Sequence, residues 1–193
     1  MVAQNFDIEQ LEKINQIEQT HEFSRIVSNT SSYIEVGVPV VLAGISLLQS
    51  DDALLKQSIY IAASFGVNLA ATYAVKHIVH RPRPRVSYPD RIVAFEDMTT
   101  NSFPSGHTSA AFNTATSLTL SFPKWYVAVP SYLWASSVGY SRMNLGVHYP
   151  SDVFCGAVLG VCSAFLTEKV NDWFWKTQNN KRLLGSEKEF VWY

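Results

Sequence analysis

The chain has 193 residues, with 15 basic and 16 acidic side chains and a formal net charge of -1. This length fits one compact domain rather than two, and the balanced charge gives no reason to expect a nucleic-acid partner. Charged residues make up 16% of the chain, below the roughly 25% that is usual for a soluble globular domain. The mean hydropathy is nevertheless only +0.03, which is low for a chain that crosses a membrane several times.

The N-terminal segment carries the pattern of an amphipathic helix. Apolar residues recur at every third position with polar residues between them, at Ile8, Leu11, Ile14 and Ile17. This period predicts a helix over residues 8–27, within an N-terminal unit of residues 1–32. Such a helix either packs on the domain or lies in the membrane interface, and the sequence leaves both open. Residues 1–30 lack the basic start and apolar core of a signal peptide, so none is expected.

Five uncharged apolar segments follow, over residues 36–50, 57–75, 98–123, 125–141 and 153–167. The first and last hold about 15 residues, fewer than the roughly 20 that a spanning helix needs. All but the first are rich in small residues, which suits close helix packing in a membrane. We predict an all-α integral-membrane bundle with about five spanning helices, forming a single domain over residues 1–193 with a polar tail at 171–193. A soluble all-α bundle of very apolar helices is the alternative.

A long connection separates the second and third apolar segments, from His80 to about Ser102. A helix cannot continue through Pro82 and Pro84, so the preceding helix is expected to end close to His80. Loops of this length in a compact domain are often functional.

Three polar clusters lie at the ends of apolar segments, and each contributes a cation or a histidine. Lys76 and Arg83 belong to the first cluster, and Arg142 belongs to the third. Charges at membrane depth usually mark a site, and guanidinium groups match the oxygens of a phosphate. Each cation taken alone has a simpler interpretation, which is contact with anionic lipids or a contribution to membrane topology.

The second cluster is Pro104-Ser105-Gly106-His107, at the start of the third apolar segment. Ser105 is a plausible N-cap, and Gly106 lets a ligand approach the backbone. Because a helix N-terminus attracts anions, the amides of residues 105–107 are candidates for holding phosphate oxygens. A plain capping turn would explain the same tetrapeptide.

The third cluster contains His148 and Asp152 at an i, i+4 spacing. If the last helix begins near His148, both side chains lie on one face. Asp152 can then accept a hydrogen bond from one ring nitrogen and leave the other free as a nucleophile. The short turn between Arg142 and His148 can bring Arg142 over the same site. The alternative is an aspartate that caps a helix beside a histidine with no chemical role.

Taken together, the three clusters resemble the signature of the type 2 phosphatidic acid phosphatase superfamily, in its membrane lipid phosphatase branch. That signature reads Lys-x6-Arg-Pro, then Pro-Ser-Gly-His, then Ser-Arg-x5-His-x3-Asp. It matches this chain from Lys76 to Asp152 with no position substituted. The membrane members commonly have six spanning helices, whereas five are predicted here, with the amphipathic segment in place of the first.

The resemblance implies a role for each matching residue. Lys76, Arg83 and Arg142 would bind the phosphate, and Ser105 and the Gly106 amide would add hydrogen bonds. The positioning and charge stabilisation that phosphoryl transfer requires agree with such a ring of donors.

The histidines would carry the chemistry. The resemblance implies that His148 attacks phosphorus and forms a phosphohistidine, that Asp152 orients His148, and that His107 protonates the leaving oxygen. Members of this family need no metal or other cofactor, and none is expected here. The cysteines Cys155 and Cys162 suggest neither a disulfide framework nor a metal site.

Topology follows from the requirement that all three clusters share one face of the membrane. The tail at 171–193 then lies on the opposite face, and its cations favour a cytoplasmic location for it, at Lys176, Lys181, Arg182 and Lys188. The site would face the periplasm of a bacterial inner membrane, although the arginines of residues 81–91 count against this orientation. The expected partners are membrane lipids and a lipid phosphate substrate. The candidate substrates are undecaprenyl diphosphate, phosphatidylglycerol phosphate, phosphatidic acid and lipid A phosphates.

Two other functions share these clusters. Vanadium-dependent haloperoxidases have a similar site, in which vanadate replaces phosphate, but they are typically larger and soluble. A non-catalytic membrane protein of the same fold is the third reading, and the presence of every chemically necessary residue gives it no support.

Overall fold

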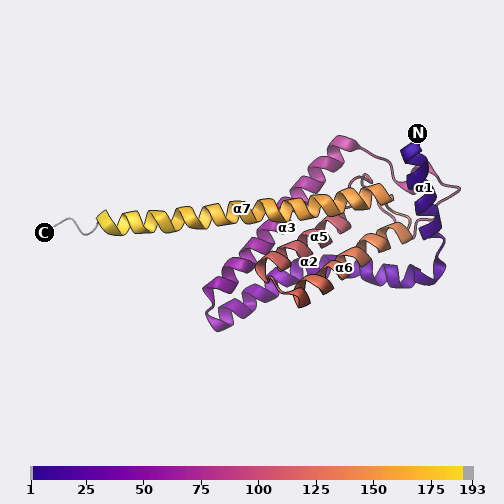
Figure 1. The fold of residues 1–193 in the computed structure, drawn as a ribbon. Helices are drawn as coiled ribbons and strands as arrows, with labels where there is room; N and C mark the ends of the chain where they lie inside the picture. The colour runs from indigo at the N-terminus through magenta and orange to yellow at the C-terminus, as the bar shows by residue number, and fades with distance from the viewer. Residues whose placement is uncertain (1, 189–193) are drawn as a thin grey trace.

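A computed structural model describes the backbone of residues 2–188 and the side chains of residues 6–177. Within this range the chain is helical and has no strand, which confirms the all-α class. Five long helices form the bundle shown in Figure 1: α2 (His21–Gln49), α3 (Asp52–Val79), α5 (Gly106–Ser121), α6 (Trp125–Asn144) and α7 (Pro150–Lys188). Three short elements lie outside it: α1 (Val2–Asn15), the 3-10 turn η1 (Glu18–Thr20) and α4 (Pro84–Ser87).

The N-terminal segment is two helices, so the prediction of one helix over residues 8–27 is wrong. α1 ends at Asn15, and α2 begins at His21 after η1. The break has a tertiary cause: the Asn144 side chain donates to the carbonyls of Ile14 (2.9 Å) and Ile17 (3.2 Å). Those carbonyls would otherwise be available to continue the helix.

α1 packs on the protein rather than floating free of it. It lies across one end of the bundle (Figure 1), with Ile8 and Leu11 buried against Ile92 and Tyr149. Of the two interpretations that the amphipathic pattern left open, the structure therefore supports packing on the domain.

α5 is the central helix, and the side chains that it buries are small or polar. Its buried residues are Thr108, Ser109, Ala110, Ala111, Asn113, Thr114, Ala115, Thr116 and Ser117. Ser109 Oγ donates to Asn68 Oδ1 of α3 at 2.7 Å, and Asn113 Nδ2 donates to Ser64 Oγ of α3 at 2.8 Å. α7 approaches so closely that a Cβ on Gly160 would lie 2.1 Å from the Ser109 carbonyl oxygen. The small residues thus allow the close packing that the sequence predicts.

The outer surface suits lipid. Three helical stretches of residues 2–188 are long and apolar enough to cross a membrane: Glu18–Gln49, Asp52–Ser87 and Pro150–Thr177. The apolar segments 36–50 and 153–167 looked too short to span, but residues 36–49 and 153–167 belong to helices of 29 and 39 residues. α5, with 16 residues, is the shortest of the five long helices. The chain is therefore a helical membrane protein.

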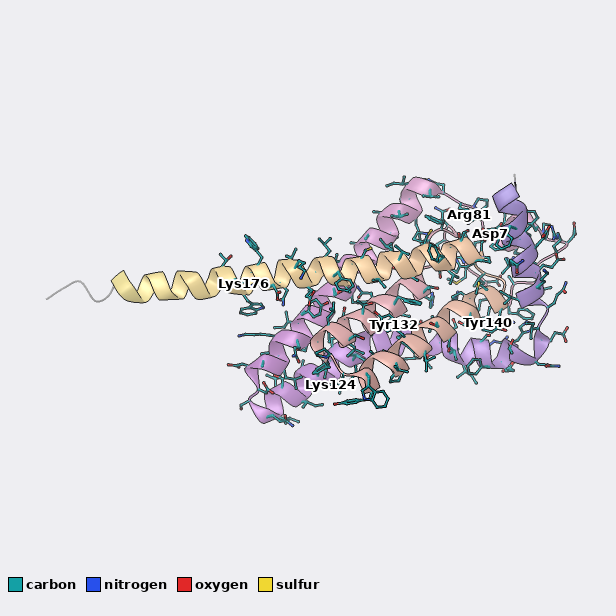
Figure 2. All side chains as sticks on the ribbon, viewed as in Figure 1. Asp7, Arg81, Lys124, Tyr132, Tyr140 and Lys176 are labelled. Atoms are coloured by element: carbon teal, nitrogen blue, oxygen red, sulfur yellow. The ribbon has the colours of Figure 1, made fainter. Side chains whose placement is uncertain are left out.

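The connections divide the bundle into two ends. α3 ends at Val79, with His80 in the left-handed region (φ 49°), so the predicted helix end near His80 is confirmed. The end of α3, the start of α5 and the junction of α6 with α7 all lie toward the end of the bundle that α1 covers (Figure 1). Figure 2 shows Asp7 and Arg81 at this end, whereas Lys124 and Lys176 lie away from it.

Candidate active site

A single cavity of about 370 Å³ gathers residues from all three sequence clusters. Five of the eight predicted site residues line it: Lys76, Arg83, Gly106, His107 and His148. The remaining three, Ser105, Arg142 and Asp152, are fully buried around it. The structure thus places two histidines, two cations and a helix N-terminus around one space.

His148 lies in the connection between α6 and α7, and only 1% of it is exposed. Its Nε2 lies 3.4 Å from Arg83 Nη1, and its Nδ1 lies 3.6 Å from Asp152 Oδ2. Because a guanidinium can only donate and a carboxylate accepts, these neighbours favour a neutral ring with Nε2 unprotonated and the proton on Nδ1. This is the predicted tautomer, although the 3.6 Å between Nδ1 and Asp152 Oδ2 is longer than a direct hydrogen bond.

Burial also decides the charge of the His148 ring. Loss of water disfavours the imidazolium, and this effect lowers the pKa of His148 to about 3 although Asp152 opposes it. The ring is therefore neutral at physiological pH, which is the form that a nucleophile requires.

The backbone around His148 is held in a tight turn. The amides of Val147 and His148 both donate to the Arg142 carbonyl, at 3.2 and 3.3 Å. Gly146 has a φ of +70°, and a Cβ there would lie 2.3 Å from the Val93 carbonyl oxygen. Only glycine fits this position without moving the backbone, so the sequence fixes the path from α6 to His148.

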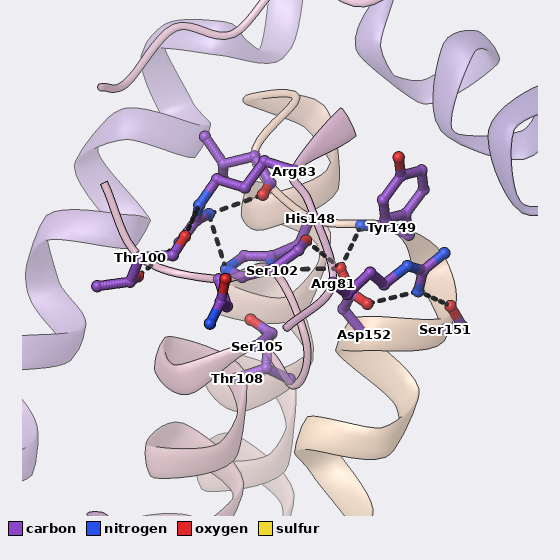
Figure 3. Close-up of polar contacts among 12 residues, drawn as sticks. Arg81, Arg83, Thr100, Ser102, Ser105, Thr108, His148, Tyr149, Ser151 and Asp152 are labelled. Carbon is purple, nitrogen blue, oxygen red and sulfur yellow. Dashed lines mark hydrogen bonds and ion pairs between the residues drawn. The ribbon is translucent and has the colours of Figure 1, made fainter. Parts of the chain in front are cut away.

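Asp152 is held from three directions. Arg81 Nη1 donates to its Oδ1 at 2.6 Å, while the Tyr149 amide (3.0 Å) and the Ser102 hydroxyl donate to its Oδ2 (Figure 3). The sequence did not single out Arg81 or Ser102 for this task. Both lie outside the signature positions, and no spacing in the chain indicates their shared partner.

Arg83 and Lys76 are oriented by the loop that precedes α5. Arg83 Nε and Nη2 donate to the carbonyl and hydroxyl of Thr100, at 2.8 and 3.0 Å. Its Nη1 donates to the Val147 carbonyl at 2.8 Å, and Lys76 Nζ donates to the Asn101 carbonyl at 2.7 Å. The long loop after α3 therefore shapes the cationic wall of the cavity, in line with the functional role expected of it.

Arg142 does not line the cavity. Its Nη1 is paired with Glu96 Oε2 at 2.8 Å and bonds the Ser28 hydroxyl of α2. Its Nε and Nη2 are buried without a partner among the described residues. Two donors of this guanidinium thus remain available, although the turn does not bring Arg142 over the cavity as predicted.

Ser105 precedes α5 as predicted, but its hydroxyl is already engaged. It shares a hydrogen bond of 2.8 Å with the Thr108 hydroxyl and does not cap the backbone. The Ser105 amide donates to the Asp152 carbonyl at 3.0 Å. The donors that α5 can offer a ligand are therefore the first-turn amides, and two residues of this turn, Gly106 and His107, line the cavity.

Comparison with curated proteins finds relatives with lipid-directed names. The chain is 41% identical over 75 residues to a lipid A 1-phosphatase of Porphyromonas gingivalis, covering 37% of this chain and 17% of that protein. It is 31% identical over 116 residues to an undecaprenyl-diphosphatase of Sulfolobus acidocaldarius, covering 60% of this chain and 55% of the relative. The matches thus span little more than half of these relatives at most.

Two solved structures share the fold. LpxE of Aquifex aeolicus aligns with a TM-score of 0.71 at 23% identity, over 85% of this chain and 95% of its own. The PAP2-type phosphatidylglycerolphosphate phosphatase of Bacillus subtilis aligns with a TM-score of 0.73 at 23% identity, over 89% and 87%. The model of the PAP2 superfamily matches residues 57–176, which include every residue of the three clusters. The chain therefore belongs to the PAP2 superfamily.

Proposed function

We propose that this protein is a membrane lipid phosphatase or diphosphatase that works through a phosphohistidine on His148. The observation that carries the proposal is the cavity itself, in which His148 faces Lys76, Arg83 and the first turn of α5 at one end of an apolar bundle. This is the arrangement that phosphoryl transfer needs, because its catalysis rests on positioning and charge stabilisation.

In the proposed reaction the phosphate sits among Lys76, Arg83 and the amides of Gly106 and His107, with Arg142 behind them. The lone pair of His148 Nε2 attacks phosphorus, and the bond from phosphorus to the lipid oxygen breaks. The electron pair of that bond stays on the leaving oxygen. As Nε2 becomes bonded to phosphorus, the ring gains positive charge, which Asp152 stabilises from the Nδ1 side.

His107 serves as the acid and then as the base. It lines the same cavity as His148, so it is positioned to protonate the departing oxygen. In the second half of the reaction it takes a proton from water, whose oxygen attacks phosphorus and releases inorganic phosphate. His148 is then free again, and no other group is consumed.

The substrate class follows from a second, apolar cavity that adjoins the first. This cavity of about 400 Å³ lies between α2 and α3 and shares Glu35, Val36 and Phe65 with the active-site cavity. Its other walls are mostly aliphatic, formed by Pro39, Val40, Ala43, Leu55, Ser58, Ile59 and Ala62. An apolar tail fits there while its phosphate reaches His148. Candidate substrates are undecaprenyl diphosphate, phosphatidylglycerol phosphate, phosphatidic acid and lipid A phosphates.

We place α2, α3, α5, α6 and α7 across a bacterial inner membrane, with the site on the periplasmic face and the tail at 171–193 in the cytoplasm. The orientation rests on the cations of the tail. The arginines of the loop after α3 count against it, because the positive-inside rule counts Lys and Arg and gives little weight to nearby carboxylates. Arg81 pairs with Asp7 and Asp152, Arg85 with Asp97, and Arg91 with Glu12.

The test is a panel of the four candidate lipids, assayed for phosphate release with the wild-type protein and with His148→Ala. The wild type should release phosphate from at least one lipid, and His148→Ala should lose at least about 1000-fold of that rate, as expected when a nucleophile is removed. Trapping should yield an acid-labile, alkali-stable phosphoprotein from the wild type alone.

His77→Ala is the matched control, since His77 is an exposed histidine of α3 that does not line the cavity. It should retain wild-type activity. A folded wild-type protein that released no phosphate from any of the lipids would contradict the function, and an active His148→Ala would contradict the nucleophile.

A further inference from the structure

α1 and the loop after α3 meet directly behind the proposed nucleophile. Asp152, which faces His148 Nδ1, has its Oδ1 bound by Arg81 Nη1 at 2.6 Å. Arg81 Nη2 in turn binds Asp7 Oδ2 of α1 at 2.8 Å. A single guanidinium thus links the carboxylate of the active site to a carboxylate of the N-terminal helix.

The start of α7 belongs to the same network. Asp7 Oδ1 accepts the backbone amide of Ser151 at 3.0 Å, and Asp7 Oδ2 accepts the Ser151 hydroxyl. Asp7 therefore supplies, from another helix, the capping carboxylate that the N-terminus of α7 favours. Arg81 also donates to the Ser151 hydroxyl at 2.7 Å, and its guanidinium carbon lies 3.9 Å from the centre of the Tyr149 ring.

Several contacts hold α1 in place, so Asp7 can keep Arg81 and Ser151 in position. At its C-terminal end, Asn15 Nδ2 donates to the carbonyls of Val93 and Asn144, both at 2.9 Å, and Asn15 Oδ1 accepts the Val93 amide at 3.0 Å. Ile8 and Leu11 are buried beside Asp7. The helix is thus held along its length on the end of the bundle that contains the cavity.

We propose that Arg81, held by Asp7, is a positioning residue for the His148–Asp152 pair, and that α1 is therefore a working part of the active site. Arg81 does not line the cavity, so it does not contact the substrate. It fixes Asp152 Oδ1 and thereby turns Oδ2 toward His148. Without it, this fully buried carboxylate loses the one arginine that pairs with it among the described residues, and only the Tyr149 amide and the Ser102 hydroxyl remain to hold it.

This inference rests on the proposed function, because it needs His148 as the nucleophile. Loss of Arg81 should slow the chemical step while substrate binding stays the same. A cation of the cavity wall such as Arg83 would behave differently, because its loss removes a contact with the phosphate itself.

The experiment compares Arg81→Gln, Asp7→Asn and the double variant in full-length protein, using whichever lipid phosphate the wild type hydrolyses. Single-turnover formation of the phosphoprotein and steady-state kcat and KM are measured. Arg81→Gln should lower both rates about 100-fold, the effect expected of roughly 1 Å of misplacement. Asp7→Asn should lower them about tenfold, and KM should change by less than about twofold in each case.

Arg85→Gln is the control, because Arg85 lies in the same loop but forms an exposed pair with Asp97. It should match the wild type. If Arg81 and Asp7 act through one chain of contacts, the double variant should be no slower than Arg81→Gln, since coupled residues are non-additive. Thermal unfolding in detergent identifies any variant that has lost its fold, and Asp7→Asn, which keeps the shape of the side chain, then carries the test.

Each of the following outcomes would overturn the inference. Wild-type rates in Arg81→Gln, or a raised KM at constant kcat, would show that Arg81 does not act through Asp152. Additive effects of the two substitutions would show that Asp7 does not act through Arg81, so that α1 has no part in positioning the pair. An active His148→Ala would overturn the proposed nucleophile and this inference with it. An inactive His148→Ala beside a fully active Arg81→Gln would overturn the inference alone.

Discussion

A buried imidazole is a useful nucleophile only if its reacting nitrogen stays free of a proton. Two neighbours of His148 arrange this, since Arg83 faces Nε2 as a donor and Asp152 faces Nδ1 as an acceptor. Burial, together with the charge of Arg83, lowers the pKa of His148 to about 3 against the opposing effect of Asp152. The ring is therefore held in its reactive form by its surroundings and needs no separate base to activate it.

This arrangement predicts an unusual titration. In protein with labelled histidines, the ring signals of His148 should not shift between pH 5 and pH 8, whereas a free histidine titrates near pH 6.5. Because the pKa of His148 is lowered to about 3, the ring stays neutral throughout this range and becomes protonated only as the pH falls toward that pKa. His148→Gln assigns the signal. A midpoint above about pH 5 would show that the site tolerates the imidazolium and would contradict the argument.

The sequence predicted which side chains meet in the site but not how each is used. The three clusters had fixed internal spacings, and five of their residues share one cavity. Arg81 could not be predicted in the same way, because its partners Asp7 and Asp152 are 74 and 71 residues away. The pair between Arg142 and Glu96 could not be predicted either, because the position of Arg142 in the signature says nothing about Glu96.

The helices place the site by packing closely at small residues. α7 meets α5 at Gly160, where no Cβ fits, and this contact sets where the start of α7 lies relative to the start of α5. The end of α3 at His80 was predicted well because the prolines that follow it stop the helix, and α5 begins after Ser105 as predicted although the Ser105 side chain forms no capping hydrogen bond. The boundary at Asn15 was missed because tertiary hydrogen bonds, rather than local sequence, end α1.

A methyl group at this contact should therefore separate the two helices. Gly160→Ala would place a carbon 2.1 Å from the Ser109 carbonyl oxygen, and backbone cannot move aside as a flexible side chain can. We expect the free energy of unfolding in mixed micelles to fall by at least about 2 kcal/mol, within the range seen for overpacked interiors. Activity should fall as well, because the start of α7 carries Asp152.

Gly37→Ala is the matched control, since Gly37 of α2 has open space where the new carbon would lie. Its stability should be unchanged or slightly higher, because alanine favours a helix over glycine. Equal effects at both positions would mean that the contact between α5 and α7 is not tight.

The whole molecule has a polar interior and an apolar exterior. Side chains such as Ser64, Asn68 and Asn113 are buried and hydrogen-bonded between helices, while Val40, Leu47 and Leu48 are exposed. This distribution explains why the mean hydropathy of +0.03 seemed too low for a membrane protein. An average over the sequence cannot distinguish polar residues that face inward from polar residues that face water.

The proposed orientation can be tested with single cysteines. In a background where Cys155 and Cys162 are replaced by alanine, Val86→Cys reports on the active-site end and Lys124→Cys on the opposite end. Both positions are exposed. A thiol reagent that cannot cross membranes, applied to intact bacterial cells, should label the Val86 variant and not the Lys124 variant. The reverse pattern would place the site in the cytoplasm, and labelling of both would contradict an odd number of crossings between them.

The polar contacts of α5 also bear on how the chain enters a bilayer during synthesis. Taken alone, α5 would expose a histidine, an asparagine and many hydroxyls to hydrocarbon, over only 16 residues. Such a segment gains little from leaving water by itself, because each unsatisfied polar group in lipid is costly. Its partners Ser64, Asn68 and Thr72 lie on α3, which is synthesised first. If α5 crosses the bilayer as proposed, we expect it to be stable there only once α3 is in place to share these hydrogen bonds.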